Sequence, residues 1–392
     1  MGWELISKTL AKATDEYKDE EIELLRRLCT IDCGTCNIEG NSQVISVLSD
    51  FFTAANIEHE TVDAGKFGRH FVARIRPENP RGKIILNAHI DTVFKPGDTK
   101  INEFCIDESG WIHGCGVSDC KGGVVISAFA MRICKELGCL PEYEIAAIYN
   151  CDEEVGSPSG KLLLKREAEN ATCAICFEPS RDEDGILTAR MGVGAAHIEV
   201  TGKRAHPAMF WNGASATECL VKTLNKLYDE GAKLPNVYYN VTEFDSGPSG
   251  CMSPLASCNV GFRVNVDTPY AVSEKLLMSL ENDVPVDGCT VKVTCEQRSP
   301  VMLHSAENVM LYKYISEIGR KYMNRELPEQ TTYGTGDANH LSDYGVPTVC
   351  GMGSYMSGPH TLKEKCRADS IPQRTLLTAL ALAMFNERVF AE

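Results

Sequence analysis

The chain has 392 residues, a formal net charge of −15, 43% hydrophobic residues and 24% charged residues. This length exceeds one ordinary hydrophobic core, so we expect two domains, and the composition excludes a disordered chain. The acidic balance argues against nucleic acid and anionic membranes as partners, because both bind basic surfaces. Neither a long apolar run nor the apolar core of a signal peptide is found, so we expect a cytoplasmic protein without a membrane span.

The 18 cysteines are spread along the chain, and we expect reduced thiols rather than a disulfide framework. Two pairs have the spacing of metal or redox motifs. Cys173 and Cys176 lie in a predicted strand, where residues three apart face opposite sides of the sheet. Cys33 and Cys36 resemble a redox dithiol, but they follow a predicted helix rather than a strand. A thiol oxidoreductase is therefore the weakest of our functional hypotheses.

The first predicted helices, residues 3–13, 19–29 and 41–55, show apolar residues at helical spacing. Strands follow near 57–62 and 70–76.

A continuous apolar run, residues 84–88, then leads directly into His89 and Asp91. Such runs are typical of the covered strands of parallel sheets, which bind ligands beyond the strands' carboxyl ends. His89 and Asp91 share one face in strand geometry, so Asp91 can orient the imidazole while the other ring nitrogen binds a metal. The alternative is a capped loop with a satisfied histidine.

Three more segments with acidic residues lie next to predicted strands or helices. Asp119 lies in a glycine-rich segment before a predicted helix at 124–137, as a fixed ligand or as a helix N-cap. The next strand ends in Asp152, Glu153 and Glu154, which form either a solvated loop or a site compensated by a divalent cation. Another strand ends at Glu178. The alternation of strands and helices predicts an α/β domain with a largely parallel sheet.

The order of elements changes near residue 188. To about residue 298 it reads strand, helix, strand, strand, helix, strand, which predicts an inserted α+β domain of ferredoxin-like type. The α/β pattern then returns. We therefore expect a discontinuous catalytic domain, residues 1–187 and 299–392, with a mixed, largely parallel sheet, and an insertion at 188–298.

Five segments in this order resemble the M20 family of co-catalytic zinc amidohydrolases, which includes acetylornithine deacetylase, succinyl-diaminopimelate desuccinylase and glutamate carboxypeptidase. The segments are Ala88-His89-Ile90-Asp91-Thr92-Val93, Gly116-Val117-Ser118-Asp119-Cys120-Lys121-Gly122-Gly123, Asp152-Glu153-Glu154-Val155-Gly156, Glu178-Pro179-Ser180 and Gly358-Pro359-His360.

The resemblance implies two divalent metal ions, Zn²⁺ or alternatively Co²⁺ or Mn²⁺, with the ligands His89, Asp119, Glu154, Glu178 and His360. Asp119 would bridge the two ions. Glu153 would act as the general base, and Asp91 would hold His89.

The insertion would be the family's lid and dimerisation domain. Its His206, in Gly202-Lys203-Arg204-Ala205-His206-Pro207, would stabilise the oxyanion in the site of the partner subunit of a homodimer. Arg263 is either a ligand of a substrate carboxylate or a surface arginine of its strand. Gly336 and Asp337, in a glycine-threonine-aspartate turn, would lie near the substrate, although Asp337 also suits a helix cap.

The resulting hypothesis is a metal-dependent hydrolase of an amide bond in a small N-acyl amino acid or short peptide that bears a carboxylate. Two alternatives stay open: a catalytically silent binding protein of the same fold, and a hydrolase of another C–N bond in a carbamoyl or ureido substrate.

Overall fold

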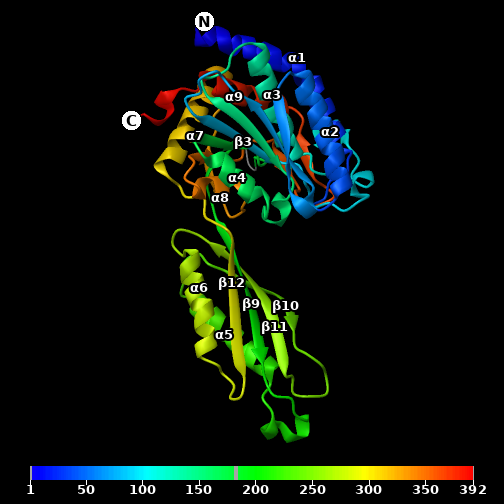
Figure 1. Cartoon of the computed structure of the whole chain (residues 1–392), viewed down its shortest axis with the longest axis vertical. Helices are drawn as coiled ribbons and strands as arrows, with labels where there is room; N and C mark the ends of the chain where they lie inside the picture. Colours follow the sequence, from blue (N-terminus) through cyan, green and yellow to red (C-terminus); the bar gives the residue numbers. More distant parts are fainter. Residues whose placement is uncertain (1, 181–183, 392) are drawn as a thin grey trace. The chain divides into compact units, whose positions relative to one another are not determined.

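The computed structural model describes residues 2–180 and 184–391, and the chain divides into two compact units (Figure 1). The first unit comprises Met1–Ala189, Leu303–Thr331 and Gly336–Glu392, and the second comprises Arg190–Met302 and Thr332–Thr335. The boundaries expected from the sequence, after residues 187 and 298, lie two and four residues before Ala189 and Met302.

The first unit is built on a six-stranded sheet. Its strands, in spatial order, are β1 (Glu58–Asp63), β2 (Arg69–Ile75), β6 (Glu144–Asn150), β3 (Lys83–His89), β7 (Ala171–Cys176) and β14 (Thr348–Val349). β3 runs parallel to β6 and β7, and β7 runs parallel to β14, whereas β2 pairs antiparallel with both β1 and β6. The mixed, largely parallel sheet predicted from the sequence is confirmed.

Three long helices, α1 (Trp3–Cys29), α3 (Lys121–Glu136) and α9 (Ser370–Met384), pack against one another beside this sheet (Figure 1). The prediction of two helices at 3–13 and 19–29 is wrong, because α1 is continuous. The intervening residues contain no glycine or proline, and Thr14 is buried with its hydroxyl donating to the Leu10 carbonyl. Among the described residues, no helix is long and apolar enough to cross a bilayer.

Further helices and strands complete this part of the chain. The helices are α2 (Ile38–Ala54), α4 (Gly160–Ala168), α7 (Ala306–Ile318) and α8 (Asp337–Asp343), and a two-stranded sheet joins β8 (Ile186–Arg190) and β13 (Glu329–Thr332). A small sheet comprises β4 (Cys105–Ile106), β5 (Trp111–His113), β15 (Met356–Ser357) and β16 (Lys365–Arg367). Because β5 pairs with β16, this sheet connects the segment before Asp119 to the segment around His360.

The second unit has its own sheet and core. Its elements follow the order β9 (Gly192–Thr201), α5 (Ala216–Gly231), β10 (Tyr239–Asp245), β11 (Leu255–Val264), α6 (Tyr270–Ser279) and β12 (Thr290–Ser299). The strands pair antiparallel in the order β10-β11-β9-β12. This is the ferredoxin-like arrangement expected from the sequence.

Candidate metal centre

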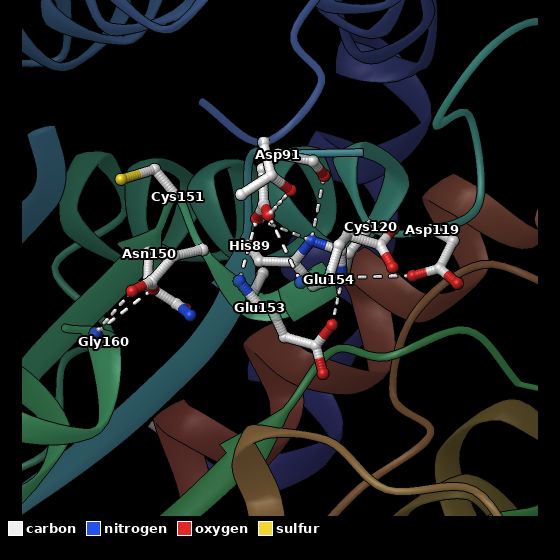
Figure 2. A network of polar contacts seen from close by, with 12 residues as sticks. His89, Asp91, Asp119, Cys120, Asn150, Cys151, Glu153, Glu154 and Gly160 are labelled. Carbon is white, nitrogen blue, oxygen red and sulfur yellow. Dashed lines mark hydrogen bonds and ion pairs between the residues drawn. The ribbon is translucent and has the colours of Figure 1, made fainter. Parts of the chain in front are cut away.

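The parallel strands bring the acidic loops of the first unit to one edge of the sheet. His89 is the last residue of β3, and the loops after β6 and β7 supply Glu153 and Glu178. The Nε2 atom of His89 lies 3.7 Å from Glu178 Oε1 and 3.9 Å from Glu153 Oε2. The same nitrogen lies 3.1 Å from Asp119 Oδ1 (Figure 2). Carboxyl ends of neighbouring parallel strands lie at the same edge, which explains why segments far apart in sequence meet here.

Asp119 faces two histidines with its two carboxylate oxygens. Oδ1 is the atom that contacts His89, and Oδ2 lies 3.3 Å from His360 Nε2. His360 Nε2 is also 3.5 Å from Glu154 Oε2. One carboxylate therefore separates two groups of donor atoms, one around His89 and one around His360.

A buried acid that received no role in the sequence analysis, Glu364, fixes the Asp119 loop. Its carboxylate accepts hydrogen bonds from the backbone N–H groups of Gly116 (2.8 Å), Ser118 (2.9 Å) and Asp119 (3.0 Å), and from the Ser118 hydroxyl (2.8 Å). The left-handed conformation of Gly116, with φ of 74°, suits this tight loop. Asp119 does not cap α3, because the N-cap position belongs to Cys120. The alternative interpretation of Asp119 as a helix cap is thus wrong.

His89 contacts both the backbone carbonyl and the carboxylate of Asp91. His89 Nδ1 lies 3.0 Å from the backbone carbonyl of Asp91 and 3.4 Å from its Oδ1 atom. A proton on Nδ1 donated to that carbonyl leaves the lone pair of Nε2 directed at the acidic groups, as metal binding requires.

The Asp91 carboxylate also fixes the loop that contains Glu153 and Glu154. It accepts hydrogen bonds from the backbone N–H groups of Glu153 and Glu154, each at 3.2 Å, and from the Thr35 hydroxyl at 2.7 Å. Thr35 carried no sequence signal, because it lies in a loop 56 residues away from Asp91. Asp91 thus links the N-terminal loop to the loop that carries both glutamates.

Burial and mutual repulsion disfavour the charged forms of Glu153 and Glu154. Burial, followed by the charge of Glu178, raises the pKa of Glu153 well above its ordinary value. Burial likewise raises the pKa of Glu154 to about 8, with Asp119 adding to the effect and His89 opposing it. These directions are those of carboxylates packed together without enough positive charge.

The pKa values of Asp119, His360 and His89 shift in the directions that favour the charged forms of these groups. Burial tends to raise the pKa of Asp119, but its hydrogen bonds with His360 and His89 outweigh burial and lower it. The hydrogen bond to Asp119 raises the pKa of His360 to about 9. The pKa of His89 also rises well above its ordinary value, because the surrounding acidic groups outweigh burial.

The donor atoms around His89 suit a divalent cation. Single ligand atoms of His89, Asp119 and Glu154 lie within 4.8 Å of one another, and so do those of His89, Cys120 and Glu178. Glu154 Oε1 is buried without a hydrogen-bond partner in the described structure, which is costly unless a cation compensates it. Imidazole nitrogens combined with carboxylate oxygens are the ligands that Zn²⁺, Co²⁺ and Mn²⁺ accept.

The turn that contains Gly336 and Asp337 makes hydrogen bonds within the protein. Gly336, rather than Asp337, occupies the N-cap position of α8, and its N–H donates to Asn339 Oδ1 at 3.0 Å. Asp337 is buried and accepts a hydrogen bond from the Ser157 hydroxyl, next to the glutamate loop. The N–H of Gly336 is therefore engaged within the turn, and the proximity of Gly336 and Asp337 to a substrate stays a prediction.

His206 and Arg263 belong to the second unit, and both are exposed. His206 Nδ1 accepts a hydrogen bond from the Ala208 N–H at 3.1 Å, which makes it the N-cap of a short 3₁₀ helix. Arg263 lies on β11 opposite Val193. Their roles toward a substrate stay predictions.

Cys33 and Cys36 differ in their exposure. Cys33 is buried, and burial raises its pKa to about 11, whereas Cys36 is exposed. A raised pKa disfavours nucleophilic attack by the Cys33 thiol.

Comparison with known proteins agrees with this geometry. The profile of Peptidase family M20/M25/M40 matches residues 85–383. Carboxypeptidase G2 of Pseudomonas sp. (strain RS-16) is 25% identical over 94% of this chain and 89% of its own length. A Mycobacterium tuberculosis protein provisionally named succinyl-diaminopimelate desuccinylase DapE is 23% identical over 78% of this chain and 82% of its own length.

Among solved structures, the YXEP protein of Bacillus subtilis, described as a dinuclear metal binding peptidase from the M20 family, superimposes with a TM-score of 0.69 at 14% identity. The match covers 94% of this chain and 98% of that one, and it shows the fold. The profile match spans well over half of the present chain. The chain therefore belongs to the M20/M25/M40 family of peptidases.

Proposed function

We propose that this protein uses two divalent metal ions, with zinc as the expected metal, to hydrolyse the amide bond of a small N-acyl amino acid or short peptide that bears a carboxylate. The observation that carries the proposal is Asp119, whose two oxygens each face a different histidine. Family membership supports an amide bond as the target, as do the names of the two relatives, a carboxypeptidase and a desuccinylase.

In this proposal His89 and Glu178 hold one ion, Glu154 and His360 hold the other, and Asp119 bridges them. Two cations bound in this way lower the pKa of a water molecule and polarise the substrate carbonyl.

Glu153 is the proposed general base. Its backbone is fixed by Asp91, and its carboxylate lies 3.9 Å from His89 Nε2 at the edge of the donor cluster. From there Glu153 removes a proton from the attacking water and delivers it to the leaving nitrogen. Gln at this position keeps the size of the side chain but cannot accept that proton.

For the second unit we propose the roles expected from the family resemblance. His206 would stabilise the oxyanion in the site of a second copy, within a homodimer formed through residues 188–298, and Arg263 would bind the substrate carboxylate. The support is that both side chains are exposed and carry the required donors.

The decisive experiment measures free-amine release by the zinc-reconstituted protein from a panel of N-acyl amino acids and dipeptides. We expect release from one class of substrate, and we expect the Glu153→Gln variant to abolish it while binding as much zinc as wild type. Absence of release from the fully metallated protein would contradict the proposal. Ureido and carbamoyl substrates would then be tested before the chain is treated as a binding protein.

A further inference from the structure

The loop that carries Glu153 and Glu154 is held on two sides. On one side Asp91 accepts from the N–H groups of both glutamates. On the other side the preceding residue, Asp152, is fully buried and accepts hydrogen bonds from Ser159 N (2.6 Å), Ser159 Oγ (2.6 Å) and Gly160 N (3.1 Å). Asp152 therefore closes the loop onto the start of α4.

A histidine outside every motif, His70, supports this second side. It lies on β2, next to β6, with an exposed fraction of 1%. Its Nδ1 atom accepts a hydrogen bond from the backbone N–H of Cys151 at 3.2 Å, and its Nε2 atom lies 3.1 Å from Ser159 Oγ. His70 also precedes the part of the chain that the family profile matches.

These contacts determine the protonation of the ring. Nδ1 is an acceptor because its partner is a backbone N–H, so the single proton of a neutral ring resides on Nε2 and is donated to Ser159. Burial lowers the pKa of His70, which favours the neutral form. A directional chain results, in which Nε2–H donates to Ser159 Oγ and the Ser159 hydroxyl donates to the Asp152 carboxylate.

We infer that His70 is a positioning residue for Glu153: it holds the two residues that precede the proposed general base, Cys151 directly and Asp152 through Ser159. The inference rests on the proposed function, because Glu153 needs a fixed place only if it moves a proton. A displacement of about 1 Å at a catalytic group is enough to slow a reaction substantially.

Three substitutions of His70 test its hydrogen bonds to Cys151 and Ser159 separately. Asn places an amide oxygen near the position of Nδ1 and can still accept from Cys151. Gln places an amide nitrogen near the position of Nε2 and can still donate to Ser159. Leu makes neither bond. We expect His70→Leu to lower kcat by about 10²-fold with KM changed less than about 2-fold, and each amide variant to recover part of the loss.

The matched control is His59→Leu, because His59 lies on the neighbouring strand β1, where its Nδ1 contacts the local Ile57 carbonyl and its ring stacks on Phe71. Zinc content and thermal unfolding are measured for every variant, and rates are compared per folded, metallated molecule. Equal kcat in His70→Leu and His59→Leu would overturn the inference. So would a loss of rate that disappears after correction for zinc or folded fraction.

Hydrogen exchange separates a failure of this inference from a failure of the proposed function. If wild type releases no amine, the proposed function fails, but exchange at the Cys151 amide still reports on the contact. We expect faster exchange in residues 151–160 of zinc-loaded His70→Leu, with unchanged exchange in the second unit. Unchanged exchange in residues 151–160 would show that His70 does not hold the loop and would overturn the inference.

Discussion

The strand-end loops of the first unit and the segment around His206 in the second unit use the same residue types in opposite ways. In the first unit His89 and Asp91 are fully buried, and each contacts other polar groups of the cluster. In the second unit His206 is exposed and makes one local hydrogen bond to Ala208. Buried charges must compensate one another, so their contacts within one chain identify a site. The contacts that an exposed side chain makes within its own chain do not identify its binding partner. Substitutions in the two regions should therefore differ in kind.

The largest effect is expected at the centre of the buried cluster. Glu153→Gln should reduce kcat by about 10³-fold, because general-base catalysis contributes on the order of 10²–10⁴-fold. Zinc content, measured by atomic emission, should equal that of wild type. The matched control is Glu108→Gln, an exposed residue whose substitution should leave kcat unchanged. A Glu153→Gln variant with wild-type turnover would remove this residue from the mechanism.

The second prediction tests whether the cluster is also a structural unit. Glu364→Ala removes the acceptor of three backbone N–H groups and one hydroxyl, so we expect a loss of about 3 kcal/mol in the free energy of unfolding. Zinc affinity should fall about 10-fold to 100-fold, because the Asp119 loop loses its support. Denaturant unfolding and competition with a chelator measure the two quantities. Lys363→Ala, at an exposed neighbour, should change neither.

The third prediction concerns the exposed region. His206→Ala should lower kcat by about 10²-fold if the imidazole stabilises an oxyanion. Because His206 is exposed, the free energy of unfolding should stay within about 0.5 kcal/mol of wild type. Zinc content should not change. His197→Ala, at another exposed histidine of the same unit, serves as the control. Loss of zinc in His206→Ala would erase the contrast between the two regions.

The smallest effect tests a buried acid away from the cluster. Glu21 on α1 is fully buried, and burial raises the pKa of its carboxyl to about 8, although the nearby Thr375 hydroxyl opposes the shift. Between pH ~4.5 and 8 the unfolded chain releases this proton while the folded chain retains it, so the stabilising effect of the protonated carboxyl is lost as pH rises.

We therefore expect wild type to lose about 2 kcal/mol of unfolding free energy between pH 5 and 6.5 relative to Glu21→Gln, as measured by urea unfolding. The exposed Glu16→Gln should follow the wild-type curve. Parallel curves for wild type and Glu21→Gln would contradict the assignment of a neutral buried acid.

Much of the fold and of the cluster was accessible from the sequence. The continuous apolar run before His89 predicted a central strand, and β3 is buried on both faces. The βαββαβ order predicted the ferredoxin-like insertion, which the pairing of β9, β11 and β12 confirms. The helical pattern wrongly predicted two helices in place of α1, which is continuous because no glycine or proline interrupts it.

Residues that act through long-range contacts were not predictable. Thr35, His70 and Glu364 lie in no motif that specifies their partners, and each contacts the site loops across a large sequence separation. A hydrogen bond of this kind depends on how strands and loops pack, and sequence spacing does not encode it. The contact of His89 with the Asp91 carbonyl, in addition to the expected carboxylate, has the same origin.

The sequence by itself thus determined the residue types, the strand ends that carry them and the family to which the chain belongs, because hydrophobic periodicity and motif spacing are local properties. Only the tertiary structure decided that Asp119 offers one oxygen to each of two histidines, that Asp91 holds the glutamate loop, and that Glu364 holds the Asp119 loop. These arrangements follow from the parallel alignment of β3, β6 and β7, which places distant loops at one edge and buries their charges together.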